Sequence, residues 1–259
     1  MSTPRRPAPQ APTARAPVPL ARLTTVELRK LADTRAGLSL LVVIGLGAVT
    51  TAAVLLGWAP REELTFTGFF SFGLLPSAVL LPVLGILSMT GEWSQRTALT
   101  TFTLAPARLR VMAAKVAAGV LVALAATVAT LLLSAAANVL GIALGGDGGW
   151  RMAGSLYWQA ALTEVLFVLM GMAFGALLQS SPLAIVAFFA LPTLWSVLRE
   201  AIHSVQRVTA WLDLGVTTEP LSSPSMTAGQ WGRLAVSALL WIALPLALGL
   251  WRVLRREVA

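Results

Sequence analysis

The stretch VMAAKVAAGVLVALAATVATLLLSAAANVLGIAL, residues 111–144, decides the fold class, because it is an almost uninterrupted apolar run. Its one ionisable residue is Lys115. About 20 apolar residues are enough for a helix to cross the hydrocarbon of a bilayer. The stretch is longer than this, so it predicts a membrane-spanning helix at about 115–141 whose N-terminal part continues beyond the bilayer as the same helix.

Five further apolar runs lie on either side of this stretch. Together they predict six spans, at about 37–57, 68–89, 115–141, 157–178, 182–198 and 232–251. Of the 259 residues, 57% are hydrophobic and only 12% are charged, whereas a soluble domain has about 25% charged residues. The mean hydropathy is +0.79. These values exclude an ordinary soluble enzyme and predict an all-α integral membrane protein.

The charges indicate how the chain is oriented in the membrane. The net charge of +8 comes from basic residues at the ends of the apolar runs, which indicates membrane topology and not nucleic-acid binding. Of the 19 Lys and Arg residues, only five fall on the side where the odd-numbered spans end: Arg61, Arg151, Arg199, Arg207 and Arg233. Because basic residues concentrate in cytoplasmic loops, we expect a multi-pass protein of the cell membrane with both termini in the cytoplasm.

The chain has no cysteine and one histidine, His203. Thiolate metal sites, disulfides and cysteine nucleophiles are therefore excluded, and a histidine metal cluster or a Ser-His-Asp triad is disfavoured. We predict neither a metal site nor a catalytic residue.

Two segments outside the spans have a distinct pattern. Residues 1–21 are rich in Pro, Ala and Arg and lack the apolar core of a signal peptide, which predicts a disordered cytoplasmic tail ahead of one domain at 22–259. Residues 22–35 alternate apolar and charged side chains with helical spacing, which is typical of a helix on the bilayer surface. In the outer segment 199–231, helical spacing predicts a short interfacial helix containing Ile202 and Leu212, followed by a Pro/Ser loop at 219–225.

The most informative loop is GEWSQRTALTTFTLAPARLRVMAAK, residues 91–115, on the predicted inner side. Pro106 suits the first position of a helix, and Thr103 lies where a capping residue could sit. A simple positive-inside anchor would explain the cations that follow Pro106. It would not explain why Glu92, Thr97 and Thr100 precede them.

This loop resembles the signature loop of ABC type 2 permeases, which has a Gly-Glu pair, a Thr-rich short helix, Pro-x-Arg and a lysine. In that family the loop contains the cytoplasmic coupling helix that docks on the ATPase subunit. The resemblance implies a coupling role for Gly91, Glu92, Thr97, Thr100, Pro106, Arg108 and Lys115. Residues 93–96 depart from the Gly-Thr pairing often found there. The amphipathic segment with Glu27, Arg29, Lys30 and Arg35 resembles the family's connecting helix, so the resemblance covers about 22–256.

The resemblance implies the membrane subunit of an ABC exporter, with two permease copies and two separate ATPase chains. A P-loop needs a lysine that follows glycine, and neither Lys30 nor Lys115 does. ATP and Mg²⁺ would therefore be bound by the partner ATPase, and we predict no cofactor on this chain. Two other classes stay open: a non-transporting sensor or assembly protein, and a membrane-embedded enzyme. The enzyme would need two or more polar catalytic groups at one depth.

One carboxylate lies inside a predicted span. Glu164 falls roughly 10 Å into the fourth span at 1.5 Å per residue, where an unpaired charge costs about 2.5–3.5 kcal/mol. It either lines a translocation path, facing Asn138 of the third span, or is a protonated structural group bonded between helices. Two glycine pairs, Gly171 with Gly175 and Gly141 with Gly145, predict close helix packing within the subunit or at a dimer seam.

Overall fold

The computed structural model describes residues 18–94, 108–202 and 206–255, and every regular element in these ranges is a helix. Six helical stretches are long and apolar enough to cross a membrane, which confirms the six predicted spans. They are Arg35–Trp58, Phe66–Gly91, Arg108–Ala143, Gly154–Leu178, Ser181–Leu198 and Ala228–Arg255. The third is one continuous helix, as the length of its apolar run predicts.

Helix α1 (Leu20–Asp33) is the predicted amphipathic helix, and α2 (Arg35–Trp58) is the first span. Between them the backbone of Thr34 is extended, and its side chain accepts a hydrogen bond from the amide of Gly37, which caps α2. The amphipathic helix was predicted to extend to Arg35. This prediction is wrong, because α1 ends at Asp33 and Arg35 is the first residue of α2.

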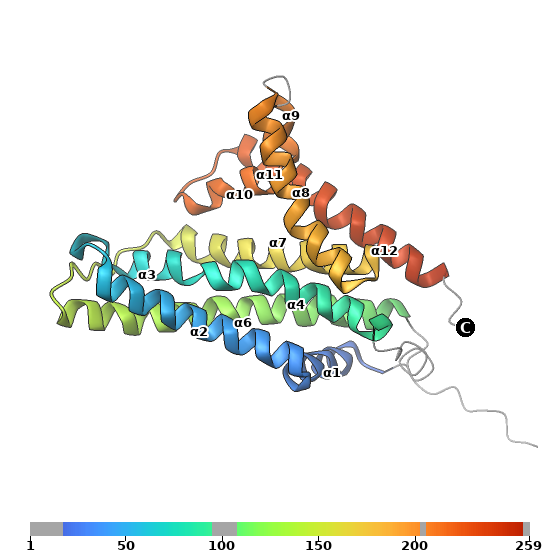
Figure 1. Ribbon diagram of the computed structural model, residues 1–259, viewed down its shortest axis with the longest axis horizontal. Coiled ribbons are helices and arrows are strands. Elements are labelled where there is room, and N and C mark those ends of the chain that lie inside the picture. Colours follow the sequence, from blue (N-terminus) through green and yellow to red (C-terminus); the bar gives the residue numbers. More distant parts are fainter. Residues whose placement is uncertain (1–17, 95–107, 203–205, 256–259) are drawn as a thin grey trace, which may run out of the picture.

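Helices α2, α4 (Leu75–Ser94), α6 (Arg108–Ala143) and α7 (Gly154–Leu178) lie side by side, and α4 packs most extensively against α7 (Figure 1). Glycines allow the close approach of α4 and α7. A Cβ atom on Gly171 would lie 2.2 Å from the carbonyl oxygen of Pro82, and one on Gly175 would lie 2.9 Å from that of Ile86. Gly171 and Gly175 thus serve packing within the subunit.

Two spans are interrupted at prolines. The second consists of α3 (Phe66–Gly73) and α4, which are separated at Leu74, two residues before Pro76. The sixth was predicted as one helix at 232–251, but it consists of α11 (Ala228–Ala238), the π-helical segment η4 (Leu239–Ala243) and α12 (Leu244–Arg255). Pro245 has no N–H and would crowd the carbonyl four residues earlier, so the wider turn accommodates it.

The fifth span, α8 (Ser181–Ala201), lies at a steep angle to the layer formed by α2, α4, α6 and α7 (Figure 1). It leads to α9 (Gln206–Leu212), α10 (Leu214–Thr218) and the 3-10 helix η3 (Glu219–Ser222). A short helix therefore lies in the predicted outer segment, but Ile202 falls outside it. The predicted loop at 219–225 is also partly wrong, because residues 219–222 are helical and α10 precedes them.

The two ends of the bundle are held by different contacts. At one end, the amide of Phe66 donates to the carbonyl of Gly149 at 2.9 Å, and the amide of Gly148 donates to that of Leu64 at 2.9 Å. At the other end, α1 and the end of α12 each contact the first turns of α6. An even number of spans predicts that both chain ends lie on one side. That this side is cytoplasmic stays a prediction.

Candidate functional site

Two predicted groups of residues meet in a buried ion pair between α1 and α6. The Lys115 Nζ donates to Glu27 Oε2 at 2.7 Å, and the side chains are 2% and 7% exposed, respectively. The Lys30 Nζ donates to the other oxygen, Oε1, also at 2.7 Å. Both oxygens of Glu27 therefore face a cation, and α1 is fixed to α6.

The burial of Lys115 changes the interpretation of its charge. An ionised side chain at 2% exposure has lost its water, and it is tolerated because a carboxylate compensates it. In this conformation Lys115 lies inside the subunit and positions the first turns of α6, and its charge is not presented on the surface. Arg29 and Arg35 are exposed.

Arg108 lies at the start of α6 and reaches α12. Its Nη1 donates to the carbonyl oxygen of Val253 at 2.9 Å. Arg252 of α12 in turn donates to the carbonyl of Leu177 near the end of α7, at 2.7 Å. These two hydrogen bonds link the start of α6 to the end of α12, and the end of α12 to the end of α7. An arginine is favourable at a helix C-terminus because it offsets the negative end of the helix dipole.

The remaining coupling residues are described only in part. Gly91 lies in the last turns of α4, where a Cβ atom would meet nothing within 4 Å. The side chain of Glu92 and all of Thr97, Thr100 and Pro106 lie outside the described residues. The coupling helix thus stays a prediction.

Glu164 and Asn138 are both buried, at 1% and 0% exposure, but their hydrogen bonds are to other residues. Ser77 of α4 donates to Glu164 Oε1 at 2.9 Å. The Asn138 side chain donates to the carbonyl of Gly148 at 3.3 Å. Among the described residues, Glu164 Oε2 and Asn138 Oδ1 have no hydrogen-bond partner. The bond between α4 and α7 favours the structural role of Glu164, and a role in lining a path stays a prediction.

We expect Ser77→Ala to lower the stability of the protein by about 1–3 kcal/mol, because it removes the one described partner of a buried carboxyl group. Glu164→Gln should change stability little, since the amide oxygen can accept the same bond. Thermal unfolding in detergent measures both effects. The control is Ser39→Ala, which removes an exposed hydroxyl that bonds only to the carbonyl of Ala36 in its own helix. Equal unfolding temperatures for Ser77→Ala and Ser39→Ala would contradict the structural role.

A cavity that the sequence did not predict lies where α8, α10 and η4 approach α4 and α7. Its volume is about 280 Å³, and its walls include Phe167, Met170, Phe188 and Trp241. Residues of five helical elements line the cavity, so no local sequence pattern predicts it. The one signal in the sequence is Asp213, an acidic residue between two leucines.

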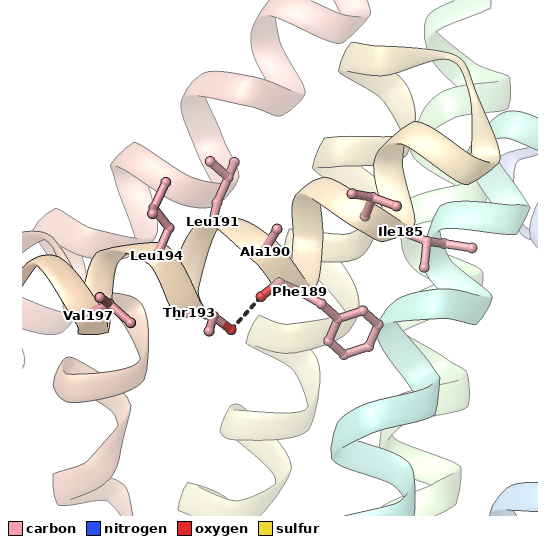
Figure 2. A pocket seen from close by; sticks show the side chains of 8 residues that line it. Ile185, Phe189, Ala190, Leu191, Thr193, Leu194 and Val197 are labelled. Atoms are coloured by element: carbon pink, nitrogen blue, oxygen red, sulfur yellow. Dashed lines mark hydrogen bonds between the residues drawn. The ribbon is translucent and has the colours of Figure 1, made fainter.

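An open apolar groove runs along α8, and all eight residues that line it come from that helix. Figure 2 shows these side chains, with the hydroxyl of Thr193 bonded to the carbonyl of Phe189 at 2.8 Å. Apolar side chains exposed on a membrane span are suited to contact lipid, so we assign no chemistry to the groove.

We compared the chain with known protein families and with curated proteins. No protein-family model matches the chain, and no sequence among the curated proteins matches it.

Proposed function

We propose that this chain is the membrane permease subunit of an ATP-driven ABC exporter in the cell membrane. It would form the translocation path together with a second permease copy and would couple to separate ATPase subunits that bind ATP and Mg²⁺. The observation that carries the proposal is the buried ion pair between Glu27 and Lys115. It joins the amphipathic helix to the span that directly follows the loop resembling a coupling loop.

The contacts at the start of α6 would allow a movement of the preceding loop to be transmitted to several helices. Helix α6 has 36 residues, which is about 54 Å at 1.5 Å per residue. Its first turns hold α1 through Lys115 and α12 through Arg108. A force applied just before α6 would thus move three elements together. ATP can shift the equilibrium between two conformations only if it binds them with different affinities, and the ATPase would supply that difference.

The test is charge reversal in the predicted coupling loop, by Arg108→Glu and separately by Glu92→Arg. In cells that also produce the ATPase, we expect normal membrane levels of each variant and at least about tenfold weaker co-purification of the ATPase, because a repulsive contact replaces an attractive one. ATP hydrolysis that no longer responds to substrate would be an equivalent result.

Two controls separate coupling from folding. Arg108→Met removes the hydrogen-bond donor to Val253 without introducing a negative charge, so it reports how much that bond contributes to stability. Arg22→Glu reverses an exposed charge elsewhere on the same predicted side. Wild-type transport and partner binding in both Arg108→Glu and Glu92→Arg would refute the coupling assignment. A chain that never co-purifies with an ATPase would favour the sensor or assembly alternative.

A further inference from the structure

Two cavities beside α8 share part of their lining, and together we call them the amphipathic space. The inner cavity, about 280 Å³, and an outer one, about 440 Å³, are both lined by Pro192, Thr193, Asp213 and Gly215. The walls of the inner cavity are mainly aromatic and aliphatic, whereas Ser196 and Glu219 line only the outer one. Ligand sites in proteins are concave, mostly apolar and carry a few polar groups, and this space has that composition.

Asp213 is the charged group at the junction of the two cavities. It is 6% exposed, and its Oδ1 accepts hydrogen bonds from the amides of Gly215 and Val216 at 2.9 and 3.4 Å, which cap α10. Its second carboxylate oxygen makes no hydrogen bond or ion pair with any residue in the described ranges. No basic side chain lines either cavity in the described part of the chain. Two backbone amides bind this carboxylate, and a cation beside its second oxygen would be attracted to it.

Two tryptophans line the inner cavity. The indole Nε1 of Trp195, which lines this cavity, is buried and has no hydrogen-bond partner among the described residues. The indole of Trp241, which also lines the cavity, donates to the carbonyl of Leu212. Neither indole nitrogen therefore offers the cavity a hydrogen bond, and both tryptophans line it with apolar ring surface.

We propose that this space binds a lipophilic aromatic cation. The apolar body of the ligand would lie against Phe167, Phe188 and Trp241, and its positive charge would lie beside Asp213, with Glu219 at the mouth. Aromatic faces attract cations, and the carboxylate of Asp213 adds a direct attraction between opposite charges. A neutral lipid would leave Asp213 uncompensated, and an anion would be repelled. That this ligand is the exported substrate rests on the proposed function, whereas its binding does not.

The test uses two ions of nearly equal size and shape but opposite charge, tetraphenylphosphonium and tetraphenylborate. Equilibrium binding of each is measured to the purified full-length chain in a neutral detergent. We expect Asp213→Asn to weaken binding of the cation at least about tenfold without weakening binding of the anion. Because asparagine also caps helices, the fold should survive. Comparing wild type with variant for each ion removes the contribution of partition into micelles.

Further variants keep the test decisive. Glu62→Gln removes an exposed carboxylate on the same predicted outer side and should leave binding unchanged. Ala78→Phe fills the inner cavity without altering Asp213 and should reduce cation binding. Unchanged cation affinity in Asp213→Asn would overturn the proposal. If Asp213→Asn did not fold, unchanged affinity in both Glu219→Gln and Ala78→Phe would overturn it equally.

A second measurement separates this proposal from the proposed function. The chain is reconstituted with its ATPase in vesicles, and ATP-dependent movement of tetraphenylphosphonium is followed. Charge-selective binding that depends on Asp213, without ATP-dependent movement of any substrate, would support the cavity assignment and contradict the exporter. ATP-dependent export of another compound, with no cation binding, would contradict the cavity assignment and support the exporter.

Discussion

Replacing Gly171 with leucine is expected to prevent the chain from accumulating as a folded protein. A Cβ atom at this position would lie 2.2 Å from the carbonyl oxygen of Pro82 and 2.8 Å from its Cα. Backbone atoms inside a helix cannot move away as a flexible side chain can, so α4 and α7 would have to separate. Overpacking usually costs about 1–3 kcal/mol. We expect more here, because the variant separates the most extensive helix pair in the bundle.

The matched control is Gly45→Leu in α2, where a Cβ atom would meet nothing within 4 Å. Both variants add the same side chain to a helical glycine of an apolar span. Yield of monodisperse protein in size-exclusion chromatography and the unfolding temperature should stay near wild type for Gly45→Leu and fall sharply for Gly171→Leu. A Gly171→Leu protein with the wild-type unfolding temperature would show that α4 and α7 do not pack as described.

Lys115→Met is expected to destabilise the protein by about 3–5 kcal/mol, because removing one partner of a buried ion pair leaves the other uncompensated. Glu27 would keep only the bond from Lys30, whose side chain is 43% exposed. The cost should appear first as release of α1 from α6. Trypsin cleavage after Arg22 and Arg29, which are exposed on α1, measures that release together with the unfolding temperature.

A double-mutant cycle tests whether the effect belongs to the ion pair. The double variant Glu27→Met/Lys115→Met should be more stable than either single variant, since two apolar side chains can replace a buried pair at little cost. Lys30→Met is the control, and it should cost at most about 1 kcal/mol because that pair is partly exposed. Equal losses in Lys30→Met and Lys115→Met, with additive effects in the double variant, would contradict the role of the buried pair.

The local sequence was enough to predict the membrane-spanning helices and the amphipathic helix before them. Six apolar runs predicted six spans, because the length and hydropathy that a bilayer requires are properties of each segment alone. The amphipathic pattern before the first span predicted α1 for the same reason. Pro76 and Pro245, which lie next to the break at Leu74 and in the turn after the π segment, are equally local signals, whereas α4 and α8 continue through Pro82 and Pro192.

Only the tertiary structure decided which of these elements meet. Glu27 and Lys115 are 88 residues apart, and Ser77 and Glu164 are 87 apart. As part of a path lining, Glu164 was predicted to face Asn138 of the third span, but its hydrogen bond is to Ser77. The actual partner lies on α4 because glycines let α4 and α7 approach most closely. The cavity beside Asp213 arises from five elements, so its shape and its unpaired groups exist only once the helices are packed together.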